Sequence, residues 1–258
     1  MKLTFLGTGT STGVPMISCN CAVCRSKDSR DKRLRCSALV QLDNGKNILI
    51  DCGPDFRTQM LALDSPPVED VLITHTHYDH LGGIDDLRPY CYVAHDQHFP
   101  VYCRADVARD LRARVPYCFA EHPYPGVPTF TLHIVEPGEV FVPRGTDTEV
   151  RAIPVIHGKL PILGFRIGPL AYITDCSKLP EEAWAMLECL DTLVINALRI
   201  KPHPTHMSLS ESLAAIERIS PRIAYLTHLS HDMGLHAEVS KILPQNVKIA
   251  VDGMTIEI

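Results

Sequence analysis

Short apolar runs, separated by turn-forming residues, recur along this chain at intervals that predict strands alternating with helices. Runs of three to eight residues rich in valine, isoleucine and leucine, bounded by glycine, proline, asparagine or aspartate, are typical of buried strands. We expect strands at residues 3–6, 37–42, 47–50, 70–73, 101–103, 129–135, 140–142, 150–156, 164–167, 170–174, 192–196 and 223–226, with two short ones near the end. Asn44-Gly45 predicts one hairpin and Gly168-Pro169 another.

Apolar residues three and four positions apart indicate helices between these strands. The clearest helix starts at the capping box Ser208-Leu209-Ser210-Glu211, and its apolar stripe continues through Leu213, Ile216 and Ile219. Further helices are expected at 55–63, 105–114, 180–187 and 235–243, whereas residues 90–148 carry few clear patterns. Strands alternating with helices in both halves predict the α/β class. No low-complexity linker divides the chain, so we expect a single domain, 1–258.

The stretch Thr74-His75-Thr76-His77-Tyr78-Asp79-His80 follows the expected strand at 70–73 and places three imidazoles and a carboxylate within seven residues. A helix would spread these groups around its circumference, because one turn takes about 3.6 residues, whereas a turn after a strand can aim all of them inward. Imidazole and carboxylate together suit Zn²⁺, Mn²⁺ or Fe. A single histidine here would be an ordinary surface residue. The full arrangement predicts a metal site.

His75-x-His77-x-Asp79-His80 resembles the defining motif of the metallo-β-lactamase-fold hydrolases. That resemblance implies an αβ/βα sandwich of two mixed β-sheets flanked by helices, with two divalent ions, Zn or Mn, in the active site. His157, Asp175 and His228 each follow an apolar strand and match the remaining ligands of the superfamily in type and order. The implied ligands are His75, His77 and His157 for one ion, Asp79, His80 and His228 for the other, and Asp175 as the bridge.

An aspartate at position 175 resembles the phosphodiesterase branch of the superfamily, since the β-lactamase branch has a cysteine at the corresponding place. The glycine-rich turn 7–15 is similar to the N-terminal loop of that branch, which includes the tRNA 3′-processing endonucleases. By residue type alone, this turn is as compatible with a tight turn after an edge strand as with a close backbone approach to phosphate. The resemblance also gives Asp51 a supporting role, hydrogen bonded to the loop of metal ligands.

Ten cysteines do not indicate a secreted disulfide framework, because the chain is long and its N-terminus lacks an export pattern. We therefore expect a cytoplasmic protein and ordinary buried thiols at most positions. Cys19, Cys21 and Cys24 are the exception, since three thiols at this spacing hold a tetrahedral zinc when a fourth ligand is available. With His231 they resemble the structural zinc site of the phosphoribosyl 1,2-cyclic phosphate phosphodiesterases of phosphonate breakdown.

Enzymes of that family carry a histidine near the scissile phosphate, just before a late helix, and His206 occupies the matching place. We expect catalysis to depend on His206, as donor of a proton to the leaving oxygen, and on Asp79. His203 is close enough in sequence to be the acting group instead. Arg88 is a candidate phosphate ligand because of its fork of donors. A salt bridge from Arg88 to Asp85 or Asp86 is an equal alternative.

These features predict a hydrolase of a small or cyclic phosphodiester similar to a phosphoribosyl cyclic phosphate; the alternative is a tRNA 3′-processing-type endonuclease. The net charge of -5 and the lack of a basic, glycine- and proline-rich arm favour the small substrate. Residues 25–35 hold six basic and two acidic residues, typical of a solvated loop and less so of a polyanion contact. No apolar run reaches the roughly 20 residues that span a bilayer. A homodimer is common in the superfamily.

Overall fold

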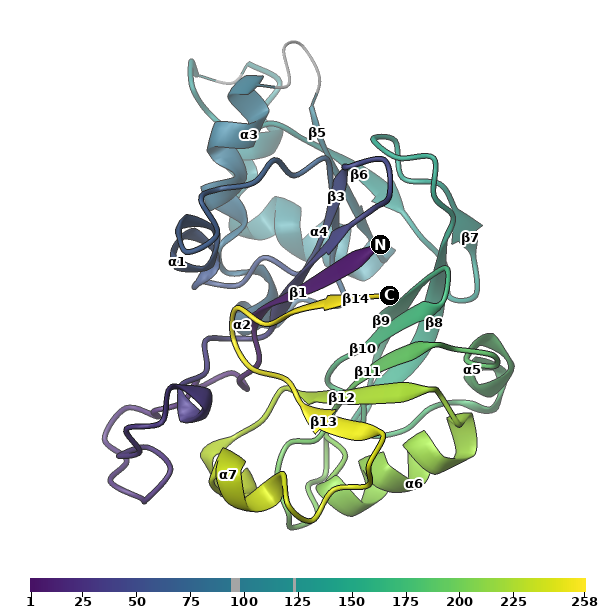
Figure 1. Ribbon diagram of the computed structural model, residues 1–258. Helices are drawn as coiled ribbons and strands as arrows, with labels where there is room; N and C mark the ends of the chain where they lie inside the picture. The colour runs from purple at the N-terminus through teal and green to yellow at the C-terminus, as the bar shows by residue number, and fades with distance from the viewer. Residues whose placement is uncertain (94–97, 123) are drawn as a thin grey trace.

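Two seven-stranded mixed sheets pack face to face in the computed structural model, which describes residues 1–93, 98–122 and 124–258 (Figure 1). The order in the first sheet is β14 (Thr255–Glu257), β1 (Lys2–Gly7), β2 (Ser37–Gln41), β3 (Asn47–Ile50), β4 (Asp70–Leu72), β5 (Phe99–Cys103) and β6 (Phe130–Ile134). The order in the second is β13 (Val247–Ile249), β12 (Ile223–Thr227), β11 (Thr192–Asn196), β10 (Leu170–Ile173), β9 (Leu160–Ile167), β8 (Val150–His157) and β7 (Val140–Phe141).

Helices cover the outer face of each sheet (Figure 1). Those associated with the first sheet are α1 (Phe56–Leu61), α2 (Tyr78–Leu81), α3 (Arg88–Val93) and α4 (Ala105–Arg114). Those associated with the second are α5 (Glu181–Met186), α6 (Leu209–Ile219) and α7 (His236–Val239). The αβ/βα sandwich expected for this sequence is confirmed.

Strands with apolar side chains on both faces explain why the protein has four layers. Successive residues of a strand point to opposite faces of the sheet. In β3, Ile48 and Ile50 face the core between the sheets, whereas Leu49 packs under the helices of the first sheet. In β11, Val194 faces the central core and Leu193 packs with the helices of the second sheet. Neither face can be left in water, so each sheet is covered on both sides.

The strand directions bring several carboxyl ends to one edge of the sandwich. β3, β4, β5 and β6 run parallel to one another, as do β10, β11, β12 and β13. β8 and β10 are both antiparallel to β9, so they run in the same direction. Side chains at or shortly after the ends of β4, β8, β10 and β12 therefore gather at this edge, although up to 153 positions separate them along the chain (228 − 75).

Most expected elements agree with the structure, and the differences have local causes. The helix at 105–114 and the strands at 47–50 and 192–196 have the predicted bounds. α3 was missed, and it begins Arg88-Pro89, where a proline in the first turn costs no intrahelical hydrogen bond. α7 is shorter than predicted: after Ser240, the amides of Lys241 and Ile242 donate to carbonyls three residues back, at 3.2 and 3.1 Å, so the chain continues as tighter turns.

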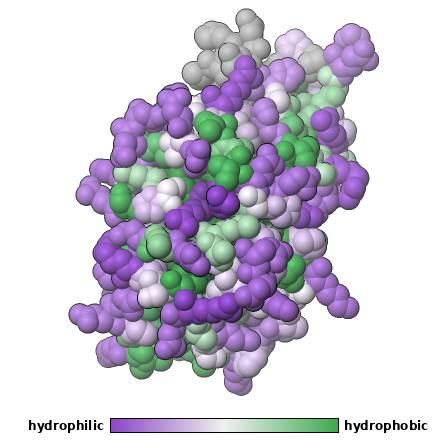
Figure 2. Space-filling model, turned by 90° about the vertical axis from the view of Figure 1, so that its right-hand side faces the viewer, coloured by the Kyte–Doolittle hydropathy of each residue, from purple (hydrophilic) through white to green (hydrophobic). Residues whose placement is uncertain are grey.

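β1 and β14 pair antiparallel, which puts the two termini side by side (Figure 1). On the face shown in Figure 2, apolar residues form several separate patches among polar ones. Within the described ranges, no helix has both the length and the apolar character needed to cross a bilayer. Most cysteines outside the Cys19–Cys24 group are buried thiols, as expected, whereas Cys91 is half-buried and Cys189 is exposed.

Candidate metal centre

All seven expected active-site ligands lie together at the edge where the strands end. Donor atoms of His75, His77 and His157 are within 4.8 Å of one another, and so are those of Asp79, His80, Asp175 and His228. Asp175 also groups with His157 and His206, so its carboxylate lies between the two sets of donors. This division into two groups with Asp175 between them is the geometry that the resemblance implies.

The histidine-rich motif is half loop and half helix. His75 and His77 lie on the extended segment after β4, and His77 caps α2 with an extended backbone (φ -61°, ψ 149°). Asp79 and His80 lie within α2 itself, so the expectation of a turn that aims all four groups inward was wrong for this second half. One helical turn can present both side chains to the site, because Asp79 and His80 are neighbours and belong to the same group of donor atoms.

Two glycines let the backbone beneath the motif approach closely. A Cβ atom on Gly53 would lie 2.0 Å from the carbonyl oxygen of Asp79, and one on Gly83 would lie 2.0 Å from the oxygen of Gly53. The amide of Cys52 donates to the carbonyl of His80 at 2.8 Å. No side chain larger than hydrogen fits at these two positions. The turn after β3 therefore sets the position of α2 and its ligands.

Asp51, at the end of β3, orients the motif through hydrogen bonds. Its carboxylate accepts from the amide of Thr74 at 2.8 Å and from Nδ1 of His80 at 2.7 Å. Donation from Nδ1 turns Nε2 of His80 toward the donor group. His157 is fixed in the same way, since its Nδ1 donates to the carbonyl of Thr205 at 2.7 Å. These contacts correspond to the supporting role expected for Asp51.

The electrostatics of the cluster suit divalent cations. Burial lowers the pKa of His75 well below its ordinary value and lowers the pKa of His228 to about 4, so both imidazoles are neutral and offer a lone pair. Burial opposes the charged form of His80 as well, but the carboxylates of Asp175, Asp79 and Asp51 together raise its pKa well above the usual range. The buried Nε2 atoms of His75 and His80 have no hydrogen-bond partner among the described residues. Orphaned nitrogens beside ionised carboxylates fit metal ions.

His206 reaches the metal centre, and His203 stands behind it. Nε2 of His206 is 3.1 Å from Oδ1 of Asp175, and its Nδ1 is 3.3 Å from Nδ1 of His203. The hydroxyl of Thr205 lies within hydrogen-bond distance of both rings, at 2.9 Å from His206 and 3.2 Å from His203. Burial lowers the pKa of His203. Of the two candidate proton donors, His206 is therefore the one placed against the ligands.

A second cluster, formed by Cys19, Cys21, Cys24 and His231, has its four donor atoms within 4.8 Å of one another. Nδ1 of His231 is 3.4 Å from Sγ of Cys21 and 3.5 Å from Sγ of Cys19. The backbone amide of Cys24 and the His231 ring lower the pKa of Cys21 to about 6, whereas burial raises the pKa of Cys24 to about 11. His231 follows His228 by three residues, so one turn supplies an imidazole to each cluster.

Cys21→Ser should destabilise the protein without slowing the folded enzyme. Loss of a structural metal ligand belongs to the strongly destabilising substitutions, and a loss of about 2 kcal/mol would lower the melting temperature of a domain of this size by about 4–8 °C. We expect the variant to lose one zinc by metal analysis and to keep its kcat per folded molecule. The exposed Cys189→Ser is the matched control. An unchanged melting temperature with full metal content would show that the cluster holds no ion.

Arg88 is engaged away from the metal ligands. Its guanidinium donates to both carboxylate oxygens of Asp85 at 3.0 Å and to the carbonyl of Gly126 at 2.6 Å. Tyr117 and Tyr92 extend this network, donating to Asp85 at 2.9 Å and to the Gly126 carbonyl at 2.7 Å. These contacts correspond to the salt-bridge alternative, and phosphate binding by Arg88 gains no support from them.

Threonines are the functional candidates that the sequence reasoning missed. Thr74, Thr174 and Thr227 are fully buried, and each directly precedes a ligand at a strand end. Thr174 donates to Oδ2 of Asp175 at 2.6 Å, and Thr10 lies 3.2 Å from Nε2 of His228. The recurrence of a threonine before His75, Asp175 and His228 was a visible pattern. A β-branched residue ends a strand well and also provides a hydroxyl that orients its neighbour.

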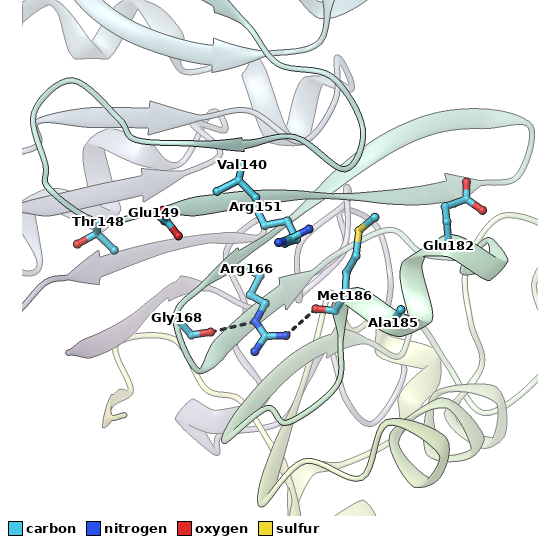
Figure 3. A pocket seen from close by; sticks show the side chains of 9 residues that line it. All are labelled: Val140, Thr148, Glu149, Arg151, Arg166, Gly168, Glu182, Ala185 and Met186. Carbon is cyan, nitrogen blue, oxygen red and sulfur yellow. Dashed lines mark hydrogen bonds between the residues drawn. The ribbon is translucent and has the colours of Figure 1, made fainter.

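A cavity of about 780 Å³ lies at the opposite end of β8 from His157 (Figure 3). Arg151 and Arg166 face each other across β8 and β9 in its wall, and Arg166 donates to the carbonyls of Gly168 and Met186 at 3.0 and 2.8 Å. Six residues of strand at about 3.3 Å each separate Arg151 from His157, which amounts to roughly 20 Å. This cavity is therefore distinct from the metal centre.

Comparison with known proteins identifies relatives of several kinds. A family model described as "Beta-lactamase superfamily domain" matches residues 46–229. A crystal structure of "a New Diphosphatase from the PhnP Family" is 40% identical, with a TM-score of 0.91 over 100% of this chain and 97% of that one. An "Octanoyltransferase" of Porphyromonas gingivalis is 42% identical over 98% of this chain and 51% of its own length. A "Ribonuclease Z" of Acaryochloris marina is 31% identical over 65% of this chain and 47% of its own length. The chain spans about half the length of these two curated relatives.

Proposed function

The chain belongs to the metallo-β-lactamase superfamily, and from this membership and its ligand set we propose that it is a metal-dependent phosphodiesterase acting on a small or cyclic phosphodiester, similar to a phosphoribosyl cyclic phosphate. The observation that carries the proposal is the position of Asp175 between the two groups of donor atoms. A carboxylate at this place can offer one oxygen to each of two ions. The 40% identical relative described as a diphosphatase supports chemistry at phosphorus.

The proposed cofactors are two divalent ions, Zn²⁺ or Mn²⁺, in the active site and one structural Zn²⁺ at the cysteine cluster. Two ions held by the active-site residues would supply a hydroxide at neutral pH and neutralise charge on a phosphoryl oxygen. His75, His77 and His157 would hold one ion, and Asp79, His80 and His228 the other, with Asp175 shared. The cluster of three thiols and His231 leaves no position open for substrate, as expected for a structural site.

The protein's own side chains position the substrate and move the proton. Asp51 and Thr205 hold the His80 and His157 rings so that their second nitrogens face the site. His206 directs Nε2 at the same place and donates a proton to the departing alkoxide. His203, 3.3 Å behind it at Nδ1, connects His206 with the surface through a half-buried ring. Catalysis thus combines a fixed ligand set with one mobile proton.

Action on tRNA 3′ ends is the second candidate function, supported by the relative named Ribonuclease Z. The basic stretch 25–35 is the surface that would contact the tRNA, but at least three of its six basic side chains already form hydrogen bonds or ion pairs within the protein. Arg33 is buried and donates to Thr8 and to the Ala250 carbonyl, both at 2.7 Å. Arg30 pairs with Asp28 and Arg35 with Asp55. A basic stretch that is tied to the body in this way favours the small substrate.

Turnover of defined substrates tests the proposal. The metal-loaded protein would be assayed on bis-p-nitrophenyl phosphate, a ribose cyclic phosphate, a nucleoside diphosphate and a pre-tRNA. We expect the highest kcat/KM among the natural-type substrates for the cyclic phosphate and no cleavage of the pre-tRNA. Preferred cleavage of pre-tRNA would establish the nuclease alternative. No turnover of any phosphorus ester with both ions bound would overturn the assignment to phosphodiesters.

A further inference from the structure

Thr10 lies in the glycine-rich turn after β1, and its hydroxyl contacts a metal-centre residue. Oγ1 of Thr10 is 3.2 Å from Nε2 of His228, although 218 positions separate the two residues. Thr10 is 7% exposed, so this contact is shielded from bulk water. The His228 ring is the only hydrogen-bond partner of this hydroxyl among the described residues.

The backbone fixes Thr10 in this position. The amide of Thr10 donates to the carbonyl of Leu229 at 3.1 Å, and the amide of Leu229 donates to the carbonyl of Thr8 at 2.9 Å. The carbonyl of Thr10 accepts from the amide of Gly13 at 2.8 Å. Two backbone hydrogen bonds thus join the turn to the segment that carries His228, and they hold the backbone of Thr10 beside the His228 ring.

Hydrogen bonding on the other side of His228 defines which of its nitrogens is free. Oγ1 of Thr174 donates to Asp175 at 2.6 Å and faces Nδ1 of His228 at 3.4 Å. Since that hydroxyl hydrogen is already used, Thr174 accepts from Nδ1–H. Nε2 of His228 therefore carries the lone pair, and the Thr10 hydroxyl donates to it. An ion at this site takes the same lone pair, which leaves the Thr10 hydrogen without its acceptor.

A buried donor that loses its partner is costly unless another acceptor replaces it. Among the described residues, no acceptor other than Nε2 of His228 lies within hydrogen-bond distance of the Thr10 hydroxyl. We propose that the Thr10 hydroxyl contacts the substrate: it donates a hydrogen bond to an anionic oxygen of a phosphoryl group held at the His228 side of the metal centre. Thr10 is then a catalytic residue, and the glycine-rich turn is part of the phosphate-binding surface. This inference rests on the proposed function.

Binding of a phosphate analogue to the metal-loaded protein tests this role without any turnover. Thr10→Val removes the hydroxyl and keeps the shape, whereas Thr10→Ser keeps the hydroxyl. Orthovanadate and inorganic phosphate would be titrated by calorimetry, with metal content measured on the same samples. We expect Thr10→Val to weaken binding by about 10- to 100-fold, the range for a hydrogen bond to a charged group. Thr10→Ser should bind as the wild type does, and both variants should keep their ions.

Thr4→Val is the matched control, because it makes the same substitution on β1, where Thr255, at 2.9 Å, is the one hydrogen-bond partner of the hydroxyl within the described ranges. It should bind vanadate like the wild type. Unchanged binding by Thr10→Val with full metal content would overturn the substrate contact. Loss of an ion from Thr10→Val would also overturn it, and would assign the hydroxyl to positioning His228. If the loaded wild type binds neither anion, the proposed phosphodiesterase function itself fails, so the two failures can be told apart.

Discussion

Asp175→Ala should lower kcat by more than about 10³-fold, beyond the 10²–10³ range seen when a single oxyanion-stabilising donor is removed. The carboxylate is buried at the junction of both donor groups, 3.1 Å from Nε2 of His80 and 3.2 Å from Nε2 of His228. Without it, neither group keeps its full set of ligands, and the shared position between them is lost. Turnover of bis-p-nitrophenyl phosphate and metal analysis of the purified variant measure the two effects.

The fold should survive this substitution, since the backbone amide of Cys176 is held independently by the side chain of Asn196 at 2.7 Å. Asp175→Asn keeps the shape but removes the negative charge, and we expect it to lose metal as well. Asp191→Ala serves as the control, because Asp191 pairs with Arg222 at the surface and lies outside the donor groups. Two tightly held active-site ions and normal activity in Asp175→Ala would contradict the role of Asp175 as the shared ligand.

His206→Ala should discriminate between substrates by the basicity of their leaving groups. General acid catalysis typically contributes about 10²–10⁴-fold. A sugar alkoxide leaves poorly without a proton, whereas p-nitrophenolate leaves readily. The rate with a ribose cyclic phosphate should therefore fall by about 10²-fold or more, while the rate with bis-p-nitrophenyl phosphate changes little. Steady-state kinetics on the two substrates, with metal content measured in parallel, provide the test.

His203→Ala is the comparison variant for this prediction. Its ring contacts His206 and Thr205 and, among the described residues, forms no hydrogen bond with a proposed metal ligand, so we expect a smaller and less selective loss. Equal losses on both substrates in His206→Ala would remove His206 from the acid role. Loss of an ion from the variant would instead identify His206 as a metal ligand, since its donor atom lies close to those of His157 and Asp175.

Local patterns in the sequence predicted the α/β class, whereas the resemblance of the His75-x-His77-x-Asp79-His80 motif implied the sandwich and the ligands of its site. Alternation within β3 and β11 leaves apolar side chains on both faces, and two such sheets can bury all of them only when helices cover the outside. His157, Asp175 and His228 could be recognised in the sequence because each follows an apolar strand and matches a ligand of the superfamily in type and order. Parallel strand ends meet at one edge, so residues with this placement converge whatever their separation along the chain.

Tertiary structure decided what depends on contacts between distant segments. Whether Arg88 binds phosphate or Asp85 depends on the loop at Gly126, which supplies a carbonyl to the same guanidinium. Whether His206 or His203 is the proton donor depends on which ring faces Asp175, a residue 31 positions before His206 in the chain. The contact between Thr10 and His228 depends on backbone pairing with Leu229 that no local pattern encodes. Periodicity reports burial and strand ends, whereas the direction of a single hydroxyl or guanidinium is set by whatever acceptor the packed fold brings within 3 Å or so of it.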